Sequence, residues 1–118
     1  MLMDLLYEQA NARPDHTALV YRDERIAFAE LVQRIERLAS GLSRRGVGPG
    51  DAVGLVLGDD PWFVASFHAI AALGAVVVPV SPAFKQAELE FCFRSAGVRA
   101  VISDERASGV CERIAAGF

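Results

Sequence analysis

Apolar residues recur with two different periods along this chain. Over residues 28–42 they repeat every three or four positions, which is the spacing of one face of an α-helix. Over residues 52–57 they run almost without interruption, which is typical of a strand covered on both faces of a parallel sheet. The first pattern predicts an amphipathic helix that ends at Gly46, and the second predicts a buried strand.

Shorter patterns precede these two elements. The apolar spacing at the start of the chain predicts a helix. This helix should end at Arg13-Pro14, because the residue before a proline disfavours helical backbone. Residues 18–21 predict a strand, residues 22–25 a polar turn, and residues 26–27 a return strand, which together make a small hairpin. The apolar face of the first helix is formed by Leu2, Leu5, Leu6 and Ala10.

From residue 52 onward, strands and helices alternate. Asp60 and Pro61 have the chemistry of a helix N-terminus, and the helix that follows runs to about Leu73 and is ended by Gly74. The later elements are a strand at 75–79, a helix at 85–96 ended by Gly97, a strand at 99–102, and a helix from Asp104 through Ile114. The inward face of the 85–96 helix is formed by Leu89, Cys92, Phe93 and Ala96. Such alternation predicts right-handed βαβ crossovers.

The helix at residues 62–73 is apolar on every side, since only Ser66 and His68 are polar. A helix of this kind is buried all round, whereas a three-strand sheet covers one side of it. We expect a partner chain or a second layer from a longer polypeptide to cover the other side. The expected fold class is therefore α/β: a mostly parallel sheet with βαβ crossovers plus a small N-terminal hairpin, as part of a larger layered α/β body. Without that cover the chain is expected to self-associate through Trp62, Phe63 and Phe67.

Composition narrows the class of protein. The 118 residues are 53% hydrophobic and 23% charged, which predicts a packed unit of domain size and excludes disorder. Twelve basic residues oppose fifteen acidic ones, so nucleic acid is not an expected partner. Residues 62–80 contain His68, Gly74 and Pro79, so they predict a helix followed by a strand and no membrane span.

The two cysteines, Cys92 and Cys111, form no CxxC pair and have no histidine at metal-binding spacing. Together with the lack of a signal-peptide pattern, they indicate free thiols and a cytoplasmic location. Both lie on apolar helical faces and are interpreted as core residues.

The glycine run, the acidic pair and His68 could each have a chemical role, but a structural role is favoured for all three. The run Gly46, Gly48 and Gly50 follows a helix and precedes a strand, the reverse of a phosphate cradle, and so predicts a turn. Asp59 and Asp60 follow a parallel strand, where they could hold Mg²⁺, but Asp60 is expected to cap the next helix and Asp59 to be solvated.

His68 could act as a general base or line a pocket, and the favoured interpretation is a buried, hydrogen-bonded packing residue. His16 is expected on a loop surface. No Ser/His/Asp or Cys/His set can be assembled. The sequence therefore predicts no catalytic, cofactor-binding or metal-binding residue within residues 1–118.

An ordered set of short motifs runs through nearly the whole chain: Phe28-Ala-Glu-Leu31, Leu38-Ala39, Leu42, Gly46 to Val53, Gly74-Ala75, Val77 to Pro79, Pro82, Glu88-Leu89 and Ser95-Ala-Gly97. The set resembles the N-terminal portion of the AMP-forming adenylating enzymes, which include acyl-CoA synthetases and peptide-synthetase adenylation domains. Three turn positions depart from the family pattern: Ala27 replaces a capping Thr, Gly58-Asp59 replaces Pro-Asn, and Ser81 replaces Asn or Asp.

The resemblance implies a full-length enzyme that condenses a carboxylic acid with ATP, releases pyrophosphate and passes the acyl group to a thiol. Its cofactors would be ATP, Mg²⁺ and CoA. The segment from Pro82 to Leu89 is more similar to acyl- or aryl-CoA ligases than to adenylation domains that load a carrier protein, which remain the alternative.

The family's phosphate loop, nucleotide contacts and catalytic lysine lie downstream of residue 118. The resemblance therefore implies that residues 1–118 form an N-terminal scaffold segment whose partner is the remainder of its own chain. Such a segment is expected to bind no cofactor and to be inactive by itself.

Two further classes remain open. A receiver-like signalling domain would use Asp104 as phospho-acceptor, 45 residues after Asp59, but its acidic pair comes late and no Lys-Pro follows Asp104. A free-standing interaction domain would lack a downstream catalytic portion. The length of the reading frame beyond Phe118 would separate this class from an enzyme segment.

Overall fold

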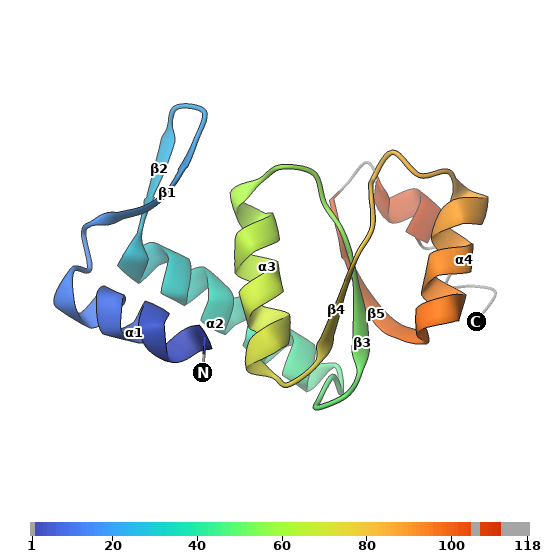
Figure 1. Ribbon diagram of the computed structural model, residues 1–118, viewed down its shortest axis with the longest axis horizontal. Helices are drawn as coiled ribbons and strands as arrows, with labels where there is room; N and C mark the ends of the chain where they lie inside the picture. Colours follow the sequence, from blue (N-terminus) through green and yellow to red (C-terminus); the bar gives the residue numbers. More distant parts are fainter. Residues whose placement is uncertain (1, 105–106, 112–118) are drawn as a thin grey trace.

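The computed structural model describes residues 2–104 and 107–111 and is elongated, with extents of 46 × 32 × 19 Å. The N-terminal part contains helix α1 (Leu2–Ala12), an antiparallel hairpin of β1 (Thr17–Tyr21) and β2 (Glu24–Ala27), and helix α2 (Phe28–Arg44). The hairpin projects away from the rest of the molecule (Figure 1). The predicted helix, hairpin and amphipathic helix are confirmed.

The second part is a parallel sheet of three strands: β3 (Ala52–Val56), β4 (Val76–Pro79) and β5 (Val98–Ser103), in the order β4-β3-β5. Val53 pairs with Val77 on one side and with Ala100 on the other. Helices α3 (Pro61–Ala72) and α4 (Gln86–Ala96) form the crossovers. The predicted α/β fold class with βαβ crossovers is confirmed.

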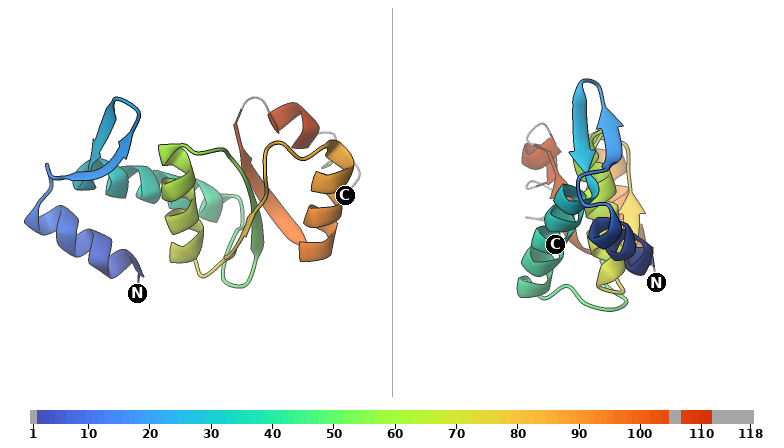
Figure 2. Two further views of the ribbon diagram at one scale, coloured as in Figure 1. Left: turned by 45° about the horizontal axis from the view of Figure 1, so that its top comes forward. Right: turned by 90° about the vertical axis from the view of Figure 1, so that its left-hand side faces the viewer.

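Helices cover both faces of this sheet, with α3 and α4 on opposite sides (Figures 1 and 2). On one face Val53 packs in a cluster with Ile70 of α3 and Leu42 of α2. On the other face Val56 packs in a cluster with Leu89 and Phe93 of α4. The central strand is therefore buried on both sides, which explains its uninterrupted apolar sequence.

Gly54 lets α4 lie close to the central strand. A Cβ atom at this position would be 2.9 Å from Cε1 of Phe93, which is closer than real Cβ contacts. The absence of a side chain at residue 54 is thus part of how the second helical layer fits the sheet.

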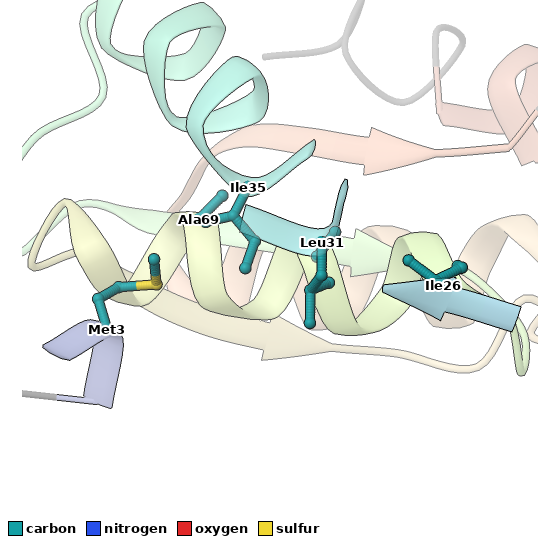
Figure 3. Close-up of a cluster of buried hydrophobic side chains, with 6 residues drawn as sticks. Met3, Ile26, Leu31, Ile35 and Ala69 are labelled. Atoms are coloured by element: carbon teal, nitrogen blue, oxygen red, sulfur yellow. The ribbon is translucent and has the colours of Figure 1, made fainter. Parts of the chain in front are cut away.

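A third cluster joins α1, the hairpin, α2 and α3 (Figure 3). Its buried members are Met3, Ile26, Leu31, Ile35, Ala65 and Ala69. Because Ala65 and Ala69 lie on α3, the chain's own N-terminal elements cover the second side of that helix. The expected second layer is thus supplied in part by α1, the hairpin and α2, which the sequence pattern does not reveal. Trp62 and Phe67 of α3 remain 44% and 38% exposed, so additional cover by a partner chain or a longer polypeptide stays a prediction. No helix in the described ranges is long and apolar enough to cross a membrane.

Helix ends follow their local chemistry. The predicted stops at Gly46, Gly74 and Gly97 all have left-handed backbone, with φ of 87°, 71° and 64°. At the start of the last predicted helix, Asp104 Oδ1 accepts a hydrogen bond of 3.0 Å from the Ala107 backbone N–H. Residues 107–111 are helical, and residues 112–114 of that predicted helix lie outside the described residues.

Two predicted helix faces need correction. In α1, Leu5 is 63% exposed, whereas Met3 and Leu6 point into the cluster with α2 and α3, so the apolar face is rotated. In α4, Leu89 and Phe93 are buried and Cys92 is half-buried, but Ala96 is exposed.

Candidate functional site

The carboxyl end of the sheet carries two adjacent hollows, which share Tyr21, Asp59 and Asp60. An apolar groove of about 230 Å³ lies between β1 and the start of α3, and it is lined by Leu19, Val20, Tyr21, Asp59, Asp60, Pro61, Phe63 and Val64. A more polar hollow of about 280 Å³ is lined by Tyr21, Arg22, Leu57, Gly58, Asp59, Asp60 and Asp104. Open α/β sheets place their ligands at this end of the strands.

Asp59 and Asp60 have the two different roles that the sequence predicts. Asp60 Oδ1 accepts a hydrogen bond of 2.7 Å from the Trp62 backbone N–H, and Pro61 occupies the first helical position, so Asp60 is the N-cap of α3. Asp59 is exposed. Over the ranges that the structure describes, no three His, Cys, Asp or Glu side chains are placed to hold a metal ion.

The glycine run forms the predicted turn from helix to strand. The Gly48 backbone N–H donates to Oδ2 of Asp51 at 2.8 Å, and the Gly50 N–H donates to the Gly74 carbonyl oxygen at 2.9 Å. These two amides, which a phosphate cradle would present to its ligand, are therefore already bonded, one to Asp51 within the turn and one to Gly74 after α3.

Arg34 of α2 contacts both the hairpin and α3, the elements that line the apolar groove. Its Nη2 lies 2.8 Å from Oε1 of Glu30 on the same helix and 3.3 Å from Oε1 of Glu24 on β2. Its guanidinium carbon lies 4.8 Å from the centre of the Trp62 ring on α3. The sequence spacing predicts the Glu30 pair, but it carries no signal for the contacts with the hairpin and α3.

His68 is only partly as predicted. It is half-buried, its ring meets Phe67 edge-on with centroids 5.9 Å apart, and burial lowers the pKa of the imidazole below its usual value of 6.5. Its Nδ1, like the hydroxyl of buried Ser66, has no hydrogen-bond partner among the described residues, so the hydrogen-bonded interpretation is wrong. His16 is exposed, as predicted, and stacks on Phe28 with centroids 6.2 Å apart.

Both cysteines are free and half-buried. Cys111 packs against the cluster that contains Val56 and Phe93, and burial raises the pKa of its thiol. A thiol held protonated in this way is a poor nucleophile, which supports the core interpretation for Cys111.

The sequence patterns do not single out Tyr21 and Arg22, two residues that line the polar hollow. Arg22 sits in the hairpin turn with a positive φ of 54°, and its guanidinium carbon lies 5.2 Å from the centre of the Tyr21 ring. The polar composition of residues 22–25 predicts the turn, but it does not reveal that this turn faces the carboxyl end of the sheet.

A sequence profile of the AMP-binding enzyme family matches residues 6–116. The chain belongs to this family. Pyochelin synthetase PchE of Pseudomonas aeruginosa is 39% identical over 97 residues, which make up 82% of this chain and 7% of that protein. With the profile covering both Asp59 and Asp104, the receiver-like alternative has no support.

Two solved structures share this fold over nearly the whole chain. The anthranilate CoA ligase AuaEII, solved with anthranoyl-AMP, has a TM-score of 0.86 and 28% identity over 96% of this chain and 22% of its own. The N-terminal domain of FACL13 from Mycobacterium tuberculosis has a TM-score of 0.84 and 29% identity over 95% of this chain and 29% of its own. The described fold is thus that of the N-terminal portion of these enzymes, and it spans less than a third of each of these relatives.

Proposed function

We propose that residues 1–118 are the N-terminal scaffold segment of an AMP-forming acyl- or aryl-CoA ligase. In the first step the carboxylate of an acid attacks the α-phosphate of ATP and pyrophosphate leaves. In the second step the thiol of CoA attacks the carbonyl carbon of the acyl-adenylate and AMP leaves. The observation that carries this proposal is the similarity over 96% of the chain to a CoA ligase solved with an acyl-AMP.

The part assigned to this chain is structural. Its glycine-run amides close a turn and Asp60 caps a helix, so these groups build the sheet edge. ATP, Mg²⁺ and CoA would be held by the remainder of the polypeptide, which would contain the ATP-binding and C-terminal parts. The free thiols Cys92 and Cys111 support a cytoplasmic location.

A second candidate is an adenylation domain that loads a carrier protein, and the similarity to pyochelin synthetase PchE favours it. The segment from Pro82 to Leu89 and the similarity to the anthranilate CoA ligase favour CoA as the thiol acceptor. The two candidates share the adenylation step and differ only in the acceptor.

The test uses the polypeptide encoded by the whole reading frame. It is incubated with ATP, labelled pyrophosphate and a panel of aromatic and aliphatic acids, and label incorporated into ATP is counted. We expect exchange that depends on the acid, followed by a thioester when CoA is added. A thioester formed only with a carrier protein would select the second candidate, and a lack of exchange with every acid would reject both.

A further inference from the structure

Arginines gather where α2 ends, at the edge of the sheet where the strands begin (Figure 1). Residues 37–50 contain three arginines and no acidic residue, although the whole chain has a net charge of −3. Arg99 of β5 adds a fourth, since its Nη2 lies 3.1 Å from the place that a Cβ atom would take at Gly46. We call this surface the α2 arginine face; it comprises Arg37, Arg44, Arg45 and Arg99.

The charges of this face have no carboxylate partner within the described ranges. All four side chains are exposed, and none forms an ion pair there, whereas Arg34 and Arg94 each pair with a glutamate. Arg45 Nη1 donates to the Gly41 carbonyl oxygen at 3.5 Å, so one guanidinium already serves the negative end of the helix. The others exceed what the helix end needs. Because clustered like charges repel, a bound anion would be stabilised here.

Arg37 and Arg44 lie on the same side of α2. They are seven positions apart, which places their Cα atoms about 10 Å apart along the helix and within about 20° of each other around it. A hollow of about 310 Å³ lies beside them, lined by Gln33, Glu36, Arg37, Ser40 and Arg44. The acid of this set, Glu36, interacts with the Tyr7 hydroxyl of α1. Two guanidinium groups therefore flank a polar hollow.

The spacing of these two arginines favours an extended anion over a single phosphate group. The Gly48 and Gly50 amides, which could have helped to hold a phosphate at this edge, are already bonded. An acidic helix with carboxylates seven positions apart repeats the spacing of about 10 Å, so each guanidinium can take its own carboxylate in the two-bond geometry that arginine favours.

We propose that the α2 arginine face binds an acidic helix of a separate partner protein, whose carboxylates pair with Arg37 and Arg44. This contact goes beyond the proposed function. It lies at the opposite end of the sheet from the two hollows, which are at the carboxyl ends of the strands. The contact therefore takes no part in adenylation, and the exchange of pyrophosphate into ATP should not depend on it.

The experiment uses the complete polypeptide and a labelled, alanine-rich helical peptide with two glutamates seven residues apart. A matched peptide carries glutamine at both positions. In fluorescence anisotropy at low ionic strength, we expect the glutamate peptide to bind and the glutamine peptide to bind about tenfold more weakly. Arg37→Gln and Arg44→Gln should each weaken binding of the glutamate peptide about threefold, as expected for exposed ion pairs. Arg25→Gln, which removes an exposed arginine of the hairpin, is the control and should leave binding unchanged.

A charge exchange makes the test specific. The double variant Arg37→Glu/Arg44→Glu should lose the glutamate peptide and bind a peptide with lysines at the same two positions. Unchanged pyrophosphate exchange and Trp62 fluorescence verify that this variant is folded.

Three results would overturn the proposal. One is equal affinity for the glutamate and glutamine peptides. Another is a charge-exchanged variant that is folded but does not bind the lysine peptide. The third is displacement of the glutamate peptide by micromolar inorganic phosphate or by a single-stranded oligonucleotide, since the face would then bind a phosphate group or nucleic acid. If the peptides behave as expected but no acid supports pyrophosphate exchange, the proposed function fails and the acidic-helix contact stands.

Discussion

At the start of α2, Ala27 has the extended backbone of an N-cap residue, with φ of −73° and ψ of 158°, but no side-chain oxygen to accept a hydrogen bond. Replacing Ala27 with Thr supplies that oxygen. We expect Ala27→Thr to stabilise the fold by about 0.5–1 kcal/mol, measured as a higher urea midpoint. Ala27→Val matches the shape of Thr without its hydroxyl. Equal midpoints for the two variants would rule out the cap as the cause.

Gly54 permits the close approach of Phe93 to the central strand. We expect Gly54→Ala to destabilise the fold by about 1–3 kcal/mol in urea unfolding, because the added methyl group meets the Phe93 ring at 2.9 Å. Gly58→Ala is the control, since a Cβ there has no neighbour within 4 Å, and it should change stability by less than about 0.5 kcal/mol. Similar losses at both positions would show that packing against α4 is not the cause.

His68 makes stability depend on pH. Because burial lowers its pKa in the folded state, the unfolded chain takes up a proton first as the pH falls below about 6.5. Folded stability is therefore lost as the pH falls through this range, until the folded imidazole is itself protonated. We expect His68→Gln to lose less stability than the unmodified chain between pH 7.5 and 5.5 in urea unfolding. The exposed His16→Gln variant should follow the unmodified chain, and a His68→Gln curve parallel to both would contradict the assignment.

At the scale of elements, Arg34 joins the hairpin, α2 and α3 through Glu24, Glu30 and Trp62. We expect Arg34→Met, which keeps an apolar stem, to cost about 1 kcal/mol in urea unfolding. The chain has one tryptophan, so its emission reports the Arg34 contact directly and should change in this variant. Arg37→Met removes an exposed arginine of the same helix. Identical emission and stability for the two variants would mean that Arg34 does not link the elements.

Local chemistry explains which elements the sequence predicts well. Asp60 and Pro61 start α3, and Gly74 and Gly97 end helices, because each acts through its own backbone or an adjacent N–H. The packing of α2 on the second side of α3 depends on residues far apart in the chain, so the apolar pattern of α3 predicts burial without identifying the cover.

For the candidate site too, the sequence predicts what depends on neighbouring residues and misses what depends on the packing of distant elements. The sequence places Asp59 and Asp60 at the end of a parallel strand, and the structure agrees. It does not predict that Tyr21 and Arg22 of the hairpin face that edge, because their position depends on how the hairpin is fixed to α2 and α3.

For the whole molecule, we expect the isolated 118-residue chain to show no binding of ATP in calorimetry at millimolar nucleotide. Its Gly48 and Gly50 amides already donate to Asp51 and to the Gly74 carbonyl oxygen, so they are not presented to a phosphate group. The complete polypeptide should bind ATP under the same conditions. A micromolar Kd for the isolated chain would contradict the scaffold role assigned to it.

The strand order β4-β3-β5 has a consequence for synthesis on the ribosome. The strand translated first of the three lies in the middle of the sheet, so each later strand adds to a free edge and none is inserted between two paired strands. At about 5–20 residues per second, β4 follows β3 out of the ribosome within a few seconds. Together with the N-terminal helices, which precede all three strands, this order lets the sheet grow outward while translation continues.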